Sequence, residues 1–266
     1  MELIPFENND ISALAELQPT EFTDIVPPHA WYLSQAHAYS FKLVRENKIV
    51  GIGTSILHDG VAWLAHIIVH PEFRNQGIGN IITKELVQFS KSKGAESIFL
   101  IATELGTPVY TKLGFVTETE YLFYKDLDVS KFESPSDALV PMEESHFSEI
   151  KFLDLKYSQE NRWEHLLAHG KNGFVYVKNK KIEGYYLPSC GEGLILAENS
   201  TAGIELMKKR FSTKENAVFP IDNIAASDYM ESKQYLPFRK ARRMYLGKRK
   251  DWIPSSIYNR IGGNLG

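Results

Sequence analysis

The sequence is poor in cysteine and in long apolar runs. Its 266 residues include a single cysteine, Cys190, which excludes an intrachain disulfide framework and a zinc site built from cysteines. No run of about 18 apolar residues occurs, so no segment is expected to span a membrane. The first residues, MELIPFENND, have neither the basic part nor the apolar part of a secretory signal. We therefore expect a cytoplasmic protein without a membrane partner.

Net charge is also small. The formal charge is -3, with 43% hydrophobic and 24% charged residues, a composition typical of a globular protein large enough for one core or two. Such a charge gives no overall attraction to phosphate backbones. Basic residues cluster at 239–243 and 248–250, but a solvated strand and loop explain them better than nucleic acid binding. No nucleic acid partner is expected.

The first half of the chain predicts a sheet. Residues 41–53 (FKLVRENKIVGIG) contain two β-like runs around a turn at 46–48, which indicates a hairpin. A third apolar run covers residues 61–69. It should end before Pro71, because proline lacks the backbone donor that regular pairing needs.

A helix and a further strand follow. Apolar residues at helical spacing predict a helix that begins near Gly79 and ends near Gly94. These apolar residues are Ile81, Ile82, Leu86 and Phe89. Residues 97–102 (SIFLIA) are nearly all apolar, as in a strand buried on both faces. The order is therefore strand, glycine turn, helix, strand.

The glycine turn carries the clearest chemical signal. The segment RNQGIG, residues 74–79, joins the strand ending at Val69 to the helix. The first turn of a helix has unpaired N–H groups and the positive end of the dipole, and glycine lets a bulky anion approach the backbone. With Arg74 beside it, this turn can hold a diphosphate. Taken alone, it can equally be an ordinary tight turn with a solvated arginine.

Two motifs in this order resemble a known family. Residues 69–79 (VHPEFRNQGIG) match the acetyl-CoA signature V-x-P-x-x-R-x-x-G-x-G/A of the GNAT superfamily of N-acetyltransferases, and residues 110–115 (YTKLGF) resemble its second signature. The resemblance covers residues 1–125. It implies an α/β (α+β) fold with a mixed, mostly antiparallel central sheet flanked by helices. It also implies acetyl-CoA (coenzyme A) as the cofactor, and no metal.

The resemblance further assigns a role to each part of the cofactor site. The strand end at 67–69 would offer backbone N–H groups to the thioester carbonyl and the pantetheine, and the loop at 74–79 would hold the diphosphate. The implied cofactor-binding residues are Ile67, Ile68, Val69, Arg74, Asn75, Gln76, Gly77, Ile78, Gly79, Thr103 and Tyr110.

Direct attack of an amine on the thioester also needs an acid and a base. Tyr110 is the expected proton donor to the CoA thiolate, because tyrosine stays protonated at pH 7. The alternative is a helix aromatic packed on the core. His66 is the first candidate for the base and Glu104 the second. A neutral, hydrogen-bonded core histidine is an equal interpretation of His66.

The acceptor is expected to be a primary amine of a small molecule or a peptide. Aromatic side chains are candidates for its pocket, although aromatic residues are more often core residues. The candidates are His29, Trp31, Tyr32, Tyr39 and Trp63. The alternative function is a CoA or acetyl-CoA sensor without transfer activity. The chain is expected to be a monomer or a homodimer.

The second half of the chain partly repeats the first. A polar segment at 128–138 separates two predicted domains, residues 1–128 and 136–266. Beyond it, five hairpin residues recur at one constant offset. They are Phe174, Val177, Lys181, Ile182 and Gly184, which repeat Phe41, Val44, Lys48, Ile49 and Gly51. No counterpart of the loop at 74–79 follows. We therefore predict a second, smaller, degenerate GNAT-like domain that contributes to the acceptor site.

Overall fold

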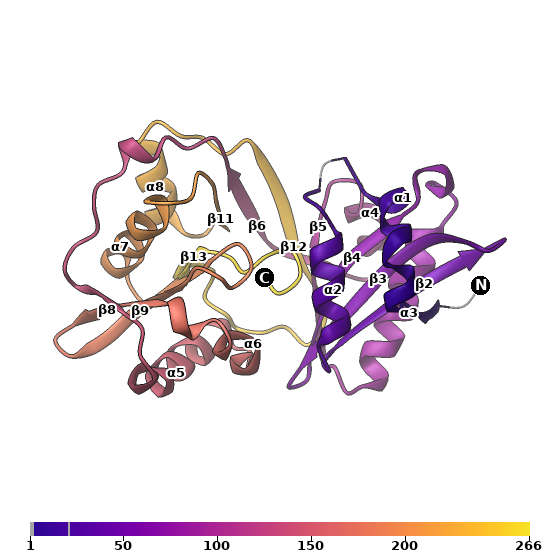
Figure 1. Cartoon of the computed structure of the whole chain (residues 1–266), viewed down its shortest axis with the longest axis horizontal. Coiled ribbons are helices and arrows are strands. Elements are labelled where there is room, and N and C mark those ends of the chain that lie inside the picture. The colour runs from indigo at the N-terminus through magenta and orange to yellow at the C-terminus, as the bar shows by residue number, and fades with distance from the viewer. Residues whose placement is uncertain (1–2, 21) are drawn as a thin grey trace. The chain divides into compact units, whose positions relative to one another are not determined.

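The computed structural model describes residues 3–20 and 22–266, which divide into two compact units. The first unit contains the described residues up to Val116, together with Met244–Arg249 and Gly263–Leu265. The second contains Thr117–Arg243, Lys250–Gly262 and Gly266. Figure 1 labels many of their helices and strands. Within residues 3–20 and 22–266, no helix combines the length and hydrophobicity that crossing a membrane requires.

The first unit is an α/β structure. Its helices and strands are β1 (Leu3–Pro5), α1 (Leu14–Leu17), α2 (Val26–Ser34), β2 (Ala38–Arg45), β3 (Lys48–His58), β4 (Val61–Val69), α3 (Ile78–Ser92), β5 (Ser97–Ala102) and α4 (Thr107–Lys112), with 3-10 turns at Asn8–Ala13 and Pro71–Phe73. The strand order is β1-β2-β3-β4-β5. All neighbours are antiparallel except β4 and β5, which are parallel. The predicted mixed, mostly antiparallel sheet is confirmed, and so are the predicted bounds of β4 and β5.

Helices cover both faces of this sheet. In β3, a Cβ at Gly51 would lie 2.6 Å from Ile82 Cδ1, and one at Gly53 would lie 2.7 Å from Leu86 Cδ1. Both glycines therefore let α3 pack closely on the sheet. Ile52 lies between them and packs in a different cluster, with residues of α1 and the turn before α2. Side chains alternate along a strand, so α3 covers one face of β3, and α1 with α2 covers the other.

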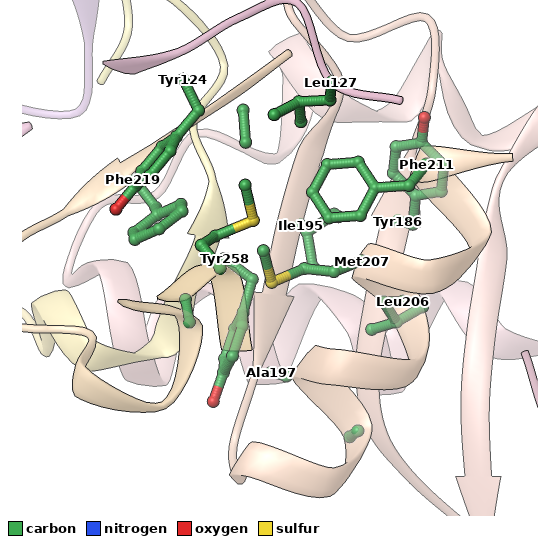
Figure 2. Close-up of a cluster of buried hydrophobic side chains, with 14 of the residues drawn as sticks. Tyr124, Leu127, Tyr186, Ile195, Ala197, Leu206, Met207, Phe211, Phe219 and Tyr258 are labelled. Atoms are coloured by element: carbon green, nitrogen blue, oxygen red, sulfur yellow. The ribbon is translucent and has the colours of Figure 1, made fainter. Parts of the chain in front are cut away.

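The second unit has a sheet of its own. Its helices and strands are β6 (Val116–Tyr124, in this unit from Thr117), β7 (Leu139–Pro141), α5 (Phe147–Ser158), α6 (Trp163–Leu167), β8 (Phe174–Lys178), β9 (Lys181–Leu187), β10 (Leu194–Ala197), α7 (Ser200–Phe211), β11 (Ala217–Pro220), α8 (Ile224–Ser232), the first part of β12 (Arg239–Gly247) and β13 (Ile257–Asn259), with 3-10 turns at Val129–Lys131, Glu144–His146, Gly170–Asn172 and Pro254–Ser256. One sheet has the order β13-β10-β9-β8-β7. Figure 2 shows the apolar core of this unit, where Met207 and Phe211 of α7 pack with Ile195 and Phe219.

The predicted repeated hairpin is confirmed down to its irregularities. In β2 and β3, Val44 pairs with Ile49 and Leu43 with Gly51, with a register shift between Leu43 and Val44. In β8 and β9, Val177 pairs with Ile182 and Tyr176 with Gly184, and the shift again falls between the two pairs. Both turns have two residues with positive φ, Glu46-Asn47 in one and Asn179-Lys180 in the other. Two independent hairpins rarely share register, turn and bulge, so this identity supports duplication.

The strand that follows the last motif of each half belongs, wholly or in part, to the other unit. After Phe115 the chain continues into β6, which lies in the second unit and pairs antiparallel with β11. Strand β12, from the second half, has β5 as a neighbour, and its residues from Met244 onward belong to the first unit. The second unit contains more residues than the first, and the bounds of both units differ from those of the predicted domains. Local periodicity does not show which neighbour a strand selects.

Candidate active site

The loop between β4 and α3 presents a row of backbone donors. Its geometry depends on left-handed residues at Asn75, with φ of 61°, and at Gly77, with φ of 78°. The N–H groups of residues 75–79 donate to no acceptor within the described part of the chain, and the first intramolecular bonds come from Asn80 and Ile81 to the Gly77 carbonyl. These donors begin a helix of 15 residues, whose dipole favours an anion at this end.

Side chains shape the same loop. The Nε atom of Arg74 donates to the Val69 carbonyl at 3.3 Å, and the Gln76 amide donates to the Glu72 carbonyl at 3.2 Å. The exposed guanidinium of Arg74 keeps its other N–H groups available for an anion. At Gly79, a Cβ would meet Val69 Cγ2 at an ordinary 3.7 Å. Gly77 is therefore the glycine that backbone conformation requires.

Strand β4 changes its pairing at its centre. Pairing with β5 runs from Val61 and Ser97 to Leu64 and Leu100 and then stops. On the other side, Ala65 pairs with Thr54 and Ile68 with Ile52. Two residues, His66 and Ile67, therefore oppose the single residue Gly53, which is a β-bulge. The predicted thioester strand end at 67–69 thus begins within the bulge and lies beyond the last pair with β5.

His66 sits in this bulge with a φ of 46°. A left-handed histidine within a strand costs about 1–3 kcal/mol, and such strain concentrates at functional sites. Its Nδ1 lies 2.8 Å from the Tyr32 hydroxyl. Burial, together with the nearby His29, lowers the pKa of His66 to about 3. The imidazole is therefore neutral at pH 7, as both sequence interpretations require.

His29 completes a cluster of rings with His66 and Tyr32. The two histidine ring centroids are 5.1 Å apart, and His29 is 5.5 Å from Tyr32. The Nδ1 atom of His29 donates to the Ile25 carbonyl at 2.8 Å. Burial lowers the pKa of His29 as well. Two neighbouring neutral imidazoles avoid the like-charge repulsion that two cations would have.

Tyr110 lies in α4 and is nearly buried, with 9% exposure. Its ring is 6.0 Å from the ring of Phe115, and the close approach of Gly106 leaves no room for a Cβ there. Burial raises the pKa of Tyr110 to about 12. Its hydroxyl makes no hydrogen bond with the residues that the structure describes, so its proton is available to a ligand. Tyr110 can therefore be both an aromatic residue packed on the core and a proton donor.

Other predicted residues are distributed differently. Glu104 is exposed in the turn before α4, and Thr103 in the same turn accepts hydrogen bonds from Gly106 and Thr107. Tyr39 packs on Phe89 of α3, with ring centroids 5.0 Å apart, and so lies on the face opposite His66. The remaining candidates are also aromatic contacts: Trp63 is fully buried beside Phe99, and Trp31 packs on Tyr32.

A shallow, open pocket of about 550 Å³ lies beside this cluster. Its lining is mostly apolar and consists of Leu14, Ala15, Gln18, Pro19, Thr20, Phe22, Asp24 and Val26. The Phe22 ring lines the cavity and meets the His66 ring edge-on at 6.5 Å. Gln18 orders the segment by donating to the Phe22 and Thr23 carbonyls and accepting from Ile25 N–H. The sequence pattern did not identify this segment.

The sequence pattern also missed Asn264. Burial raises the pKa of Tyr32, and a side-chain hydrogen bond from Asn264, which lies more than two hundred residues away in the sequence, lowers it. Both residues belong to the first unit. No local motif marks such a contact, and only the fold could reveal it.

Comparisons with known proteins agree with this geometry. Residues 8–115 match the model of the acetyltransferase (GNAT) family. The uncharacterized N-acetyltransferase YobR of Bacillus subtilis is 30% identical over 84 residues, which is 30% of this chain and 34% of that protein. The chain thus spans about a third of that curated relative's length.

Solved structures resemble the chain over nearly its whole length. A putative acetyltransferase from Pyrococcus horikoshii has a TM-score of 0.84 at 17% identity, covering 100% of this chain and 95% of that one. A tandem GNAT protein from the clavulanic acid biosynthesis pathway has a TM-score of 0.63 at 13% identity, covering 94% and 99%. At these identities the likeness concerns the fold, which is that of tandem GNAT proteins. The match to the acetyltransferase (GNAT) family model is confined to residues 8–115, within the first unit.

Proposed function

We propose that this chain is an N-acetyltransferase that moves the acetyl group of acetyl-CoA to a primary amine of a small molecule or a peptide. The observation that carries the proposal is the row of unpaired N–H groups at residues 75–79, which begins α3 beside Arg74. Such a row fits the diphosphate of coenzyme A, because several charge-assisted hydrogen bonds converge on one anion. The splayed end of β4 lies directly before this loop.

Acetyl-CoA would supply the acetyl group as an activated thioester. In the proposed reaction the neutral amine attacks the thioester carbonyl, the C–N bond forms and the C–S bond breaks. His66 takes the proton that the amine nitrogen loses, and Tyr110 gives its proton to the departing thiolate. The nitrogen becomes more acidic as it bonds to the carbonyl carbon, so a weak neutral base suffices at that stage. Solvent then returns both residues to their starting protonation.

At pH 7 both residues start in the protonation state that these roles require. Burial keeps Tyr110 protonated well above neutral pH, with a pKa of about 12, and keeps His66 neutral, with a pKa of about 3. Glu104 is the second candidate base and is exposed to solvent. We rank it below His66 because it lacks the fixed position that a bulge and a hydrogen bond give to the histidine.

Residues 136–266 are proposed to form a GNAT-like domain that binds no second cofactor. In this half, β10 ends at Ala197 and α7 begins at Ser200, so no loop comparable to residues 70–77 is present. The side chain of Asn199 accepts the Ala202 N–H at 3.0 Å, which satisfies a donor that an anion would need. Each chain should therefore bind one coenzyme A.

Release of free CoA thiol tests the reaction. The protein is incubated with acetyl-CoA and a panel of polyamines, amino acids, amino sugars and peptides, and thiol is measured over time. We expect release that depends on protein and amine, together with an acetylated product by mass spectrometry. Binding of acetyl-CoA without turnover across the panel would favour the alternative, a CoA sensor.

Titration calorimetry tests the site count. We expect one CoA per chain, and thermal stabilisation of about 2.7 kcal/mol at a ligand concentration 100 times Kd. Two sites per chain, or no shift of the melting temperature at millimolar CoA, would contradict the assignment.

A further inference from the structure

The segment whose helices pack beside His66 carries no lysine or arginine. Residues 1–41 contain neither, and their acidic residues are Glu2, Glu7, Asp10, Glu16, Glu21 and Asp24. This segment forms α1 and α2, and the hydroxyl of Tyr32 in α2 lies 2.8 Å from His66 Nδ1. A ligand that approaches His66 from this side therefore meets a surface of negative charge.

Asp24 is the carboxylate that this surface leaves available to a ligand. Asp10 already pairs with Lys42 Nζ at 2.5 Å. Asp24 is exposed, accepts the Val26 N–H at 2.9 Å and has no ion pair with any residue that the structure describes. Among the described residues that line the open pocket beside His66, Asp24 is the one with a charged side chain.

A buried nitrogen beside His66 also favours a ligand that donates hydrogen bonds. The ring of His29 is 1% exposed, and its centroid is 5.1 Å from that of His66. Its Nδ1 lies 2.8 Å from the Ile25 carbonyl oxygen, which can only accept, so Nδ1 carries the proton and Nε2 a lone pair. Nε2 has no hydrogen-bond partner among the described residues. This lone pair attracts an amine N–H and repels a carboxylate or phosphate oxygen.

The pocket suits a molecule with an amino group at each end. Its lining is mostly apolar, which favours a methylene chain, and its Phe22 ring meets the His66 ring at 6.5 Å. Burial near His66 lowers the pKa of an ammonium group, so an amine at that end loses its proton and becomes a nucleophile. At the exposed end, the Asp24 carboxylate favours the charged form.

We infer that the acceptor is an aliphatic diamine or polyamine, bound with its methylene spacer along the pocket and its second ammonium group at Asp24. Given the proposed acetyl transfer, on which this assignment rests, the amino group near His66 attacks the thioester carbonyl. Its C–N bond forms, the C–S bond of acetyl-CoA breaks, and the nitrogen gives one proton to His66. The second ammonium group is unchanged, so the mono-acetylated product keeps one positive charge.

Three acceptors of equal carbon number test this choice of acceptor. Cadaverine, pentylamine and δ-aminovalerate each carry an amino group on a five-carbon chain and end in an ammonium, a methyl and a carboxylate group. We expect kcat/KM per amino group to be about twofold to fivefold higher for cadaverine than for pentylamine, as for an exposed ion pair. The preference should decrease with added salt. A value for δ-aminovalerate equal to or above that for cadaverine would overturn the inference.

Asp24→Asn tests the carboxylate itself, because asparagine can still accept the Val26 N–H at the start of α2. It should lower kcat/KM per amino group for cadaverine to the level of pentylamine and leave pentylamine unchanged. Glu85→Gln is the matched control, since it removes one negative charge from α3, beside a different pocket. It should change neither acceptor. An equal loss for cadaverine in both variants would assign the effect to net charge and overturn the inference.

Failure of the proposed function gives a different result. If the wild-type protein releases no CoA thiol with any amine or peptide, acetyl transfer fails, and titration calorimetry of cadaverine with CoA present measures the pocket without turnover. Weaker binding to Asp24→Asn than to the wild type supports the inference, whereas equal binding, or no binding to the wild type, overturns it. Acetylation of peptides but not of cadaverine would retain the transferase and overturn the acceptor.

Discussion

The corresponding edges of β4 and β10 differ in what lies against them. In the first unit, pairing of β4 with β5 ends at Leu64, and a long loop with unpaired N–H groups follows the strand. In the second unit, β13 pairs along β10, with Ile195 opposite Asn259. The Asn259 side chain accepts Val218 N–H of β11 at 2.9 Å. The chain's own strand therefore fills, between β10 and β11, the kind of gap that β4 and β5 leave.

This difference shows that few residues distinguish a strand edge that can bind a ligand from one that another strand of the chain covers. The repeated hairpins have the same register and bulge. The ends of α4 and α8 are also alike, because Phe115 N–H bonds the Tyr110 carbonyl and Tyr235 N–H bonds the Met230 carbonyl, both at 3.0 Å. What differs is a few residues between strand and helix, one added strand, and methionine in the place of Tyr110.

Substitution of two corresponding residues, Tyr110 in α4 and Met230 in α8, should give the largest difference in kcat. Tyr110→Phe removes the proposed proton donor and should lower kcat by roughly 100-fold to 10,000-fold. Met230→Leu keeps an apolar core residue of similar volume and should leave kcat unchanged, with a stability cost below about 1.5 kcal/mol. Steady-state kinetics and thermal melts on both variants measure this. A full-rate Tyr110→Phe variant would remove the tyrosine from the mechanism.

The two helix N-termini offer the next contrast. Arg74→Ala should weaken CoA binding by about 10-fold to 100-fold, the equivalent of one charge-assisted contact of about 1.5–3 kcal/mol. Gly77→Val should do the same, because a β-branched side chain is strained at a φ of 78° and crowds the diphosphate.

Asn199→Ala in the second unit is the matched control. It removes the cap of α7 and should lower the free energy of unfolding by about 1 kcal/mol without changing CoA affinity. Calorimetry for CoA and circular dichroism for the fold distinguish the cases. An affinity loss in Asn199→Ala equal to that in Arg74→Ala would mean that both helix N-termini serve the cofactor.

Strand β13 provides a smaller effect that is specific to the closed edge. Asn259→Ala leaves the buried N–H of Val218 without its acceptor and should destabilise the protein by about 1–3 kcal/mol. CoA stoichiometry should remain one per chain, because removing one side chain creates no phosphate loop. Denaturant unfolding and calorimetry on the same sample measure both quantities. A second CoA site in this variant would show that β13 alone excludes the cofactor.

We expect His66 to contribute no pH dependence to kcat near neutral pH. With its pKa lowered to about 3, His66 stays neutral at any pH well above that value, so kcat should show no protonation step near pH 6.5. Stability responds in the opposite sense to a salt-bridged histidine. The unfolded state binds the proton first, so the contribution of His66 is fully present above about pH 6.5 and is lost as pH falls toward 3. His66→Gln should flatten that part of the stability profile, measured by urea unfolding at several pH values.

The sequence predicted the local structure of the first half, and less of the remaining structure. The apolar runs at 61–69 and 97–102 correctly predicted β4 and β5, because strands buried on both faces consist of consecutive apolar residues. The turn at residues 74–79 was likewise predicted from its glycines. The bulge at His66 could not be foreseen, since it depends on how β4 pairs with β3 around Gly53 and not on the residue type at position 66.

Long-range selection explains the other omissions. Asn264 meets Tyr32, and β13 meets β10, across separations at which periodicity carries no information. The predicted cofactor residues cluster around the loop and the strand end, but their contacts with coenzyme A remain predictions. The predicted acceptor residues do not all lie on one face of the sheet, because Tyr39 packs on α3 whereas His29, Trp31 and Tyr32 belong to α2. Proximity in the sequence does not reveal which face a ring occupies.

The exchanged strands have a consequence for how the chain can be cut. A fragment that ends near residue 128 carries both sequence motifs, yet it lacks residues 244–249, which belong to the first unit, and it leaves β5 without its β12 neighbour. An exposed, apolar strand edge recruits other chains. During synthesis on a ribosome, the first unit likewise cannot close its sheet until residue 249 has emerged, long after its motifs. We therefore expect that the segment outlined by the motifs does not fold alone, because its sheet needs residues 244–249.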